Sequence, residues 1–294
     1  MEAGILSRCS FIAVDWGTTN RRAWRIESGR VVAGERDGKG VASLTPDDYP
    51  GELEAVRARL GDHPVLLAGM VGSNRGWRDA GYIDTSATID ALASAVLPVG
   101  DRIGIVPGVR TLTAGRGDVM RGEEVQFLGA AAAGLVPDSA LLCQPGTHTK
   151  WARVSGGAIT TFSTAMVGEM FALLRAHSLI GAGMTGLARD CAAFRQGVVR
   201  AGGADLQTAL FEARAASVLG ARTGDDITSF VSGLLVGADV RANVAAGDAV
   251  HLIADPSLGA LYTAAIEQVG GAVFRVDSEA AFVAGICRVW DKMA

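Results

Sequence analysis

Apolar and polar positions follow the same order at two places in the chain. The first, FIAVDWGTTNRRAWRIESGRVVAGE (residues 11–35), has an apolar run, a polar residue, a spacer, Gly-Thr and a strand with a tryptophan. The second, ALLCQPGTHTKWARVSGGAITTFS (residues 140–163), repeats that order, and both then have a glycine turn and a third strand. Alternation of this kind is typical of half-buried strands joined by hairpin turns. The pattern predicts a duplicated three-stranded meander; coincidence between two glycine-rich hairpins is the alternative.

The rest of the pattern predicts that each meander opens an α/β domain. Short apolar runs predict buried strands at residues 64–70, 103–106, 250–254 and 272–276. Apolar residues at helical spacing predict helices at residues 122–136, 165–180, 205–219, 227–243, 259–268 and 279–291. The first of these helices lies just before the second meander and is expected to join the halves. We therefore expect two domains, residues 1–133 and residues 134–294.

Composition excludes several classes of protein. The 294 residues are 49% hydrophobic and 20% charged, with a formal net charge of −4, which favours a folded chain and offers no basic surface for nucleic acid. Cys9, Cys143, Cys191 and Cys287 are widely spaced, so we expect neither a zinc site nor a disulfide framework, and a reduced cytoplasmic compartment is the simpler interpretation. MEAGILSRCS lacks a signal-peptide apolar region, and no segment has the ~18 apolar residues of a membrane span. An oligomer is possible.

The two Gly-Thr turns have the chemistry of an anion site. Backbone N–H groups in a glycine-rich turn form a concave nest for anions, and small side chains let a phosphate approach. The residues of these turns that we expect to bind phosphate are Gly17, Thr18, Thr19, Asn20, Gly146, Thr147, His148 and Lys150.

Asp15 lies directly before the first turn, where a carboxylate would repel a bare phosphate. We therefore expect Asp15 to hold Mg²⁺ that bridges to the phosphates, because Mg²⁺ commonly binds one or two carboxylates together with phosphate oxygens. A plain turn beside a solvated aspartate is the alternative. The chain has no GxxxxGK[ST] motif and no GxGxxG after a strand, which argues against a P-loop or a dinucleotide enzyme.

Five motifs occur in order over nearly the whole chain: DWGTTNRRAW, AGMVGSN followed by GW, VMRGEEVQFLGA, PGTHTKW and HSLIGAG. Together they resemble the sugar kinase, hexokinase and actin-like ATPase superfamily and, within it, the 2-dehydro-3-deoxygalactonokinase family. The resemblance implies two ribonuclease-H-like domains with a nucleotide and substrate cleft between them. It also implies an adenosine segment at residues 254–258, including Ser257, with Gly233 and Gly237 letting a helix approach closely. Asp255 and Pro256 replace glycines that are usual there.

The family resemblance implies a kinase that uses ATP and Mg²⁺ to phosphorylate the 6-hydroxyl of 2-dehydro-3-deoxy-D-galactonate in galactonate breakdown. Two alternatives are a kinase for another keto-deoxy sugar acid and a non-kinase ATP-binding regulator of the same superfamily. A missing DNA-binding segment and the absence of an iron–sulfur cysteine cluster argue against the regulator.

Phosphoryl transfer needs a carboxylate to take the hydroxyl proton, and Asp15, Asp118, Glu123 and Glu124 are candidates. RGEEVQFLGA resembles the Gly-Asp-Gln-Gln segment of related carbohydrate kinases, which places Glu123 at the catalytic aspartate, with Glu124 second. The alternative is that both are first-turn glutamates favoured by the helix dipole. Asp118 is interpreted as a turn residue.

A sugar-acid substrate needs partners for its carboxylate and hydroxyls. The expected partners are Arg22, Gly72, Ser73, Asn74 and Trp77. Residues 72–74 end a predicted strand, where α/β sheets usually bind ligands. Arg22 points into the cleft or to solvent, and Trp77 is a wall of the sugar site or part of the core. Lys150 binds phosphate or lies on the surface, and His148 contacts phosphate or a neighbouring loop.

Overall fold

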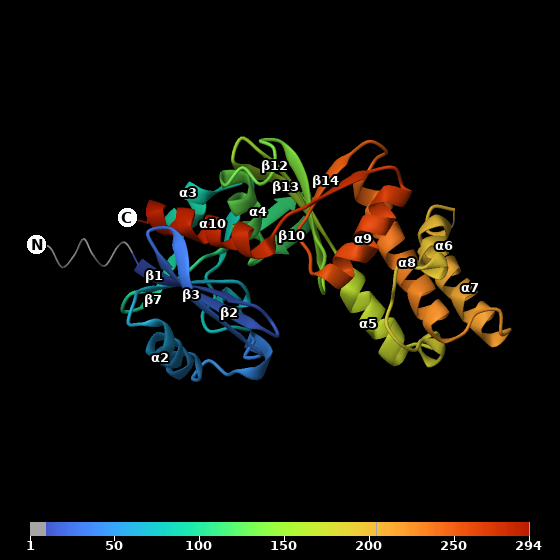
Figure 1. Ribbon diagram of the computed structural model, residues 1–294, viewed down its shortest axis with the longest axis horizontal. Helices are drawn as coiled ribbons and strands as arrows, with labels where there is room; N and C mark the ends of the chain where they lie inside the picture. The colour runs from blue at the N-terminus through green and yellow to red at the C-terminus, as the bar shows by residue number, and fades with distance from the viewer. Residues whose placement is uncertain (1–9, 204, 294) are drawn as a thin grey trace, which may run out of the picture. The chain divides into compact units, whose positions relative to one another are not determined.

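The structure is a computed structural model that describes residues 10–203 and 205–293 (Figure 1). Cys9 and the segment for which no signal peptide is expected, up to that cysteine, lie outside the described residues. The chain forms two compact units. The first contains the described residues up to Ser139, Ala152–Phe162 and the residues from Ser278 on, and the second contains Ala140–Trp151 and Ser163–Asp277.

Strands and helices alternate along the chain, which confirms the predicted α/β class. The strands are β1 (Ser10–Trp16), β2 (Arg21–Glu27), β3 (Arg30–Asp37), β4 (Val65–Ala68), β5 (Tyr82–Asp84), β6 (Ala87–Thr88), β7 (Leu97–Gly100), β8 (Ile103–Ile105), β9 (Gly108–Thr113), β10 (Arg116–Met120), β11 (Ala140–Gln144), β12 (Thr149–Ser155), β13 (Ala158–Ala165), β14 (Ala249–Leu252) and β15 (Ala272–Arg275). The helices are α2 (Tyr49–Leu60), α3 (Ile89–Ser94), α4 (Glu123–Ala132), α5 (Val167–His177), α6 (Ala192–Arg200), α7 (Leu206–Val218), α8 (Gly224–Asn243), α9 (Pro256–Gln268) and α10 (Ser278–Lys292).

The duplicated meander is confirmed. One sheet has the order β3-β2-β1-β4-β8-β7, in which β1, β2 and β3 are consecutive and antiparallel while β1, β4 and β8 are parallel. Another has the order β15-β14-β11-β12-β13-β6, so β11, β12 and β13 are again consecutive. The sequence analysis did not predict the third sheet, β10-β9-β5, nor helices α2 and α6.

In the first unit, β1 is apolar from Phe11 to Val14 because helices cover both of its faces. Ile12, Val14 and Trp16 share a core with apolar residues of α2. On the other face, the Phe11 ring stacks on Trp290 of α10 with centroids 4.6 Å apart. Figure 1 shows α2 and α10 on opposite sides of the blue strands. This layered packing holds the carboxyl end of β1, where Asp15 lies, in a rigid sheet.

Glycines bring α10 close to α4. A Cβ added at Gly129 would lie 2.0 Å from the carbonyl oxygen of Ala281, and one added at Gly285 would lie 2.0 Å from that of Val125. The C-terminal helix therefore packs in the first unit, although it follows the second meander in sequence. The predicted division into residues 1–133 and 134–294 was based on the repeated meander along the chain, whereas the two compact units are defined by packing. The predicted division stays a prediction.

The second unit combines parallel strands β11, β14 and β15 with helices α5–α9. Close approach at Gly233 and Gly237 is confirmed: an added Cβ would lie 2.1 Å from the carbonyl oxygen of Phe194 or 2.7 Å from the Cα of Val198. The helix that approaches is α6, so these glycines set the spacing between α6 and α8. Within the described part of the chain, every helix is too short or too polar to cross a membrane.

Candidate functional site

The first Gly-Thr turn closes the hairpin between β1 and β2. The Gly17 N–H donates to the Asn20 carbonyl oxygen at 2.9 Å, and Thr18, Thr19 and Asn20 are exposed. Residues 40–42 donate backbone N–H groups to the carbonyls of Thr19, Gly17 and Thr18 at 2.9–3.2 Å. The turn is therefore held through its carbonyls, while the threonine and asparagine side chains reach solvent, as a phosphate-binding turn requires.

Asp15 and Arg22 form an ion pair at the end of β1. Arg22 Nη2 donates to Asp15 Oδ2 at 2.5 Å, and the aspartate side chain is 14% exposed. The same guanidinium donates to Ser278 Oγ at 3.3 Å and lies 5.6 Å from the Trp24 ring centroid. Arg22 is thus neither free in solvent nor unpaired, because its guanidinium forms an ion pair with Asp15.

A magnesium ion at Asp15 agrees with the donor set of this turn. Among the described residues, no group of three or more His, Cys, Asp or Glu side chains gathers to hold a metal. A single carboxylate beside exposed threonine hydroxyls suits Mg²⁺ that takes its other ligands from phosphate and water, and does not suit a fully protein-bound metal. Asp15 is the residue that would hold it.

The predicted substrate loop follows β4, and its four residues differ in accessibility. Asn74 is exposed, whereas Gly72 is buried. Ser73 is 5% exposed, and its Oγ donates to the Met70 carbonyl oxygen at 2.7 Å. The Trp77 ring is 8% exposed and stacks on Tyr49 at 5.8 Å. Asn74 is thus the accessible side chain of the four, while Ser73 and Trp77 hold the loop in place.

Helix α4 begins with the two candidate bases. Gly122, at φ 106°, turns the chain into the helix, and its added Cβ would lie 3.2 Å from Gly69 Cα, so this turn packs against the end of β4. Glu123 is half-buried, and its Oε2 accepts from the Arg121 N–H at 3.0 Å. Asp118 lies within β10 instead of a loop, so its interpretation as a turn residue is wrong.

Glu124 is fully buried, and both its carboxylate oxygens accept from the Gly122 N–H at 2.8 and 2.7 Å. The pKa of Glu124 is raised to about 8, first by burial and then by the charge of Glu123, while the Gly122 hydrogen bond and Arg121 oppose the rise. Since no part of Glu124 reaches solvent, Glu123 is the more accessible of the two candidate bases.

The second Gly-Thr turn, in the second unit, is supported by α5. A Cβ added at Gly168 would lie 2.3 Å from the Gly146 carbonyl oxygen, and the Glu169 N–H donates to the Thr147 carbonyl at 2.9 Å. His148 Nε2 lies 2.5 Å from Glu169 Oε2. Thr147 and His148 are exposed. Glu169 lies in α5, so His148 contacts a neighbouring helix, whereas one of its two interpretations expected a neighbouring loop.

Lys150 is buried instead of lying on the surface, at 6% exposed, and its Nζ donates to Thr164 Oγ1 at 2.8 Å. The surface interpretation of Lys150 is therefore wrong. The buried ammonium belongs to the second residue of β12, directly after the turn, and contacts β13 through Thr164.

A buried polar network anchors the strand that follows the second turn. Thr149 Oγ1 lies 2.6 Å from the Tyr262 hydroxyl, which donates to Asp239 Oδ2 at 2.9 Å. Trp151 Nε1 donates to Asp239 Oδ1 at 3.0 Å. Burial raises the pKa of Asp239 to about 6, and the two hydrogen bonds oppose the rise. The network joins β12 to α8 and α9, so the second turn and the predicted adenosine segment share one support.

The residues in place of the usual glycines cap α9. Asp255 Oδ1 accepts from the N–H groups of Ser257 and Leu258 at 2.8 and 3.1 Å, and Pro256 occupies the first turn, where its missing N–H costs nothing. Ser257 is exposed beside this cap. The departure from the usual glycines therefore has a structural reason, a helix N-terminus made by a different capping chemistry.

Comparison with known proteins decides the family. The family model described as 2-keto-3-deoxy-galactonokinase matches residues 15–289. The chain belongs to this family. A 2-dehydro-3-deoxygalactonokinase from Escherichia coli (strain K12) is 39% identical over 282 residues, covering 94% of this chain and 96% of the relative. A probable 2-dehydro-3-deoxygalactonokinase from Rhizobium meliloti (strain 1021) is 37% identical over 292 residues, covering 94% and 95%.

Solved structures agree with this family and with a shared two-unit fold. A crystal structure of a Sinorhizobium meliloti protein that carries the same family name has a TM-score of 0.84 at 34% identity, covering 95% of this chain and 97% of that one. The activator of 2-hydroxyisocaproyl-CoA dehydratase from Clostridium difficile has a TM-score of 0.51 at 11% identity, covering 97% and 95%. This second likeness shows the fold alone.

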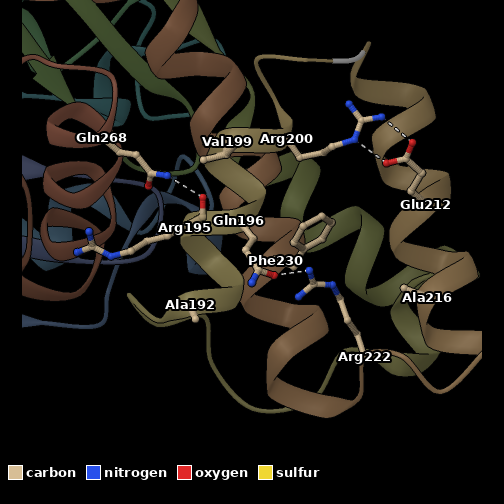
Figure 2. Close-up of a pocket in the computed structure, with 10 residues that line it drawn as sticks. All are labelled: Ala192, Arg195, Gln196, Val199, Arg200, Glu212, Ala216, Arg222, Phe230 and Gln268. Carbon is tan, nitrogen blue, oxygen red and sulfur yellow. Dashed lines mark hydrogen bonds and ion pairs between the residues drawn. The ribbon is translucent and has the colours of Figure 1, made fainter.

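A pocket of about 700 Å³ lies elsewhere in this galactonokinase-family chain, among α6–α9 of the second unit, and no predicted site residue lines it (Figure 2). The Arg222 guanidinium lies 4.2 Å from the Phe230 ring and donates to Gln196, while Arg200 pairs with Glu212. Its arginines are thus already engaged by neighbours, and the pocket adds nothing to the phosphate chemistry.

Sequence reasoning missed Asp239, Tyr262 and Arg121 in this member of the family. The sequence could have indicated a buried role for Asp239, because it is a lone acid in a largely apolar stretch of helix. It could not have indicated one for Tyr262, since a tyrosine at an apolar helix position is ordinarily a core residue. Arg121 directly precedes the Gly-Glu-Glu motif, yet only the fold shows what surrounds its guanidinium.

Proposed function

We propose that this chain uses ATP to phosphorylate the 6-hydroxyl of 2-dehydro-3-deoxy-D-galactonate in galactonate catabolism. The observation that carries the proposal is the family match over residues 15–289, with relatives of that name at 37–39% identity over nearly the full chain. The chain is accordingly a phosphotransferase with an alcohol group as acceptor.

The phosphate and metal roles go to the two turns. Residues 17–20 of the first turn bind phosphate through exposed hydroxyl and amide groups, with Asp15 on Mg²⁺. When bound, Mg²⁺ neutralises charge on the phosphates and helps to orient them. In the second turn, Gly146, Thr147 and His148 contact phosphate, with Lys150 behind them. Ser257 borders the adenosine.

Glu123 is the proposed general base, because it is half-buried at the start of α4 while Glu124 is sealed from solvent. A base must reach the hydroxyl whose proton it takes. Glu124 supports the turn before Glu123 through the Gly122 N–H. Asn74 binds substrate hydroxyls, Arg22 approaches the reacting groups together with Asp15, and Gly72, Ser73 and Trp77 form the floor of the sugar-acid site.

A coupled ADP-release assay tests the proposal, with ATP, Mg²⁺ and a panel of keto-deoxy sugar acids and neutral sugars. Turnover with 2-dehydro-3-deoxygalactonate above its gluconate epimer is expected, and addition of a chelator in excess of Mg²⁺ should abolish it. Preference for the epimer would instead indicate a kinase for another keto-deoxy acid. ATP binding without turnover on any member of the panel would overturn the kinase assignment in favour of a regulator.

The place of action completes the proposal. Galactonate catabolism uses small intracellular metabolites, and the scattered cysteines agree with a reduced cytoplasm. Fractionation of cells that express the full chain would test this location, and recovery outside the cytoplasmic fraction would contradict it.

A further inference from the structure

The guanidinium of Arg121 lies buried between the two segments assigned to substrate binding and catalysis. Its side chain is 3% exposed, and its backbone N–H holds Glu123. A Cβ added at Gly72 would lie 2.9 Å from Arg121 Nη1, so the charged end lies directly against the loop of residues 72–74. All of these residues belong to the first unit.

This guanidinium is incompletely satisfied. Nη2 donates to the Gly81 carbonyl oxygen at 2.8 Å, whereas Nε and Nη1 are buried without a hydrogen-bond partner in the described part of the chain. The acid that pairs with it, Asp79, has Oδ1 at 3.6 Å from Nη2, beyond hydrogen-bond range. Buried charges are ordinarily paired and hydrogen-bonded, so a cation with two idle donors indicates a missing anionic partner.

Arginine also matches a carboxylate geometrically, because its planar fork offers parallel N–H donors to two oxygens. Arg22, the arginine that the sequence favoured for this task, already holds Asp15. Arg121 is a buried arginine with unused donors beside the substrate loop.

Two of the groups that lie against Arg121 reach solvent. Tyr82 is 36% exposed, and its ring centroid lies 4.4 Å from Arg121 Cζ; the Asp79 side chain is 54% exposed. On the Nη2 side, where Asp79 lies, an incoming anion therefore reaches the guanidinium by displacing an exposed side chain.

We propose that Arg121 receives the carboxylate of the sugar acid, and that Asp79 occupies this position weakly until the substrate displaces it. The inference rests on the proposed function and names the residue that would select an acid over a neutral sugar. Asp79 then acts as an internal competitor, so removing its charge and removing Arg121 should change substrate affinity in opposite directions.

The test compares the sugar acid with its uncharged primary amide in the ADP-release assay, using the full chain. For Arg121→Met, the ratio of kcat/KM for acid over amide should fall roughly 10- to 100-fold, the loss typical of hydrogen bonds to a charged group. Arg121→Lys, which keeps the charge without the fork, should lie between. For Asp79→Asn, KM for the acid should fall, because the competing negative charge is removed. The turn itself should be preserved, since asparagine can still accept the Gly81 N–H that Asp79 accepts at 2.9 Å.

Arg110→Met is the matched control, because Arg110 forms an exposed pair with Asp84 on the neighbouring strands and should leave both substrates unaffected. An equal loss on acid and amide, or a higher KM in Asp79→Asn, would overturn the proposal. So would a selective loss for the acid in Arg22→Met that Arg121→Met does not show. Should Arg121→Met fail to fold, Asp79→Asn still decides by the sign of its effect. Absence of ADP release by the wild-type protein with the sugar acid would contradict the proposed function itself.

Discussion

Glu123 and Glu124 are neighbours in sequence with opposite environments. The first is half-buried on the Arg121 N–H, and the second is sealed under the turn at Gly122. From sequence alone, Glu123 ranks first as the candidate base because it aligns with the catalytic aspartate of related carbohydrate kinases. The burial of Glu124 is a physical reason for the same ranking. At the scale of the residue, accessibility is what separates a candidate base from a structural acid.

Glu123→Gln tests the catalytic role. The amide keeps an oxygen acceptor for the Arg121 N–H but cannot take a proton, so kcat should fall by about 10²–10⁴-fold. ATP affinity, measured by calorimetry, should stay at the wild-type value. Retention of full activity would show that another group is the base.

Glu124 should make stability depend on pH. Its pKa is raised from 4.5 to about 8 by burial, so between these values the folded chain keeps a proton that the unfolded chain releases. The free energy of unfolding should therefore fall as pH rises through this window, by up to ~1.4 kcal/mol per pH unit from this group. Glu124→Gln removes the titration, so its stability relative to wild type should rise from pH 5 to pH 8 in urea unfolding. A difference that is independent of pH would contradict the buried-acid account.

At the scale of elements, a buried hydrogen-bond network and a close glycine contact between helices fix the elements that bear the predicted site residues. Asp239 and Tyr262 join β12 to α8 and α9, and Gly129 and Gly285 join α4 to α10. Each contact fastens an element that carries a predicted functional segment. Their loss should therefore reduce stability.

Tyr262→Phe should destabilise the chain by about 1–3 kcal/mol, because the hydroxyl serves two buried oxygens, Thr149 Oγ1 and Asp239 Oδ2. Tyr49→Phe is the matched control. Tyr49 is equally buried, but its hydroxyl has no partner in the described part of the chain. Urea unfolding of both variants should show a loss only for Tyr262→Phe, which should also raise KM for ATP. Equal behaviour of the two would show that the network contributes nothing.

Gly129→Ala should destabilise α4 against α10 by about 1–3 kcal/mol, since the new methyl group would overlap backbone atoms of α10. Gly51→Ala provides the contrast. It lies in α2 with nothing within 4 Å of the added Cβ, so it should be neutral or stabilise by ~0.5–1 kcal/mol. Thermal unfolding would measure both, and an unchanged midpoint for Gly129→Ala would refute the close contact.

At the scale of the whole molecule, the last helix completes the first unit. Helix α10 buries Phe282, Ile286 and Val289, and its Phe282 and Trp290 rings contact Trp24 and Phe11 near the beginning of the chain. The first unit therefore cannot complete its core until the end of the chain is present.

A chain that ends at Asp277 should thus lose the native first unit and expose the apolar faces of α4 and β1. We expect a broad, weakly cooperative thermal transition and poor recovery as folded protein. A chain that ends at Asp291 keeps the buried positions of α10 and should unfold like the full chain. Native-like unfolding of the shorter chain would show that α10 is dispensable.

The sequence by itself determined the local pattern of this protein. Alternation and glycine turns placed β1–β3 and β11–β13 correctly, and helical spacing placed α8, α9 and α10 close to their observed bounds. Local chemistry sufficed there because strand period, turn glycines and amphipathic faces are properties of consecutive residues. The family motifs then identified the two Gly-Thr turns and the Gly-Glu-Glu segment as the candidate site.

Only the tertiary structure decided which of these groups are engaged, accessible or unsatisfied. Arg22 is occupied by Asp15, Trp77 packs on Tyr49, and Arg121 retains idle donors. Each outcome depends on burial and on partners distant in sequence, which periodicity cannot report. The return of α10 to the first unit is of the same kind, because packing of Gly129 against Ala281 is a contact between the middle and the end of the chain.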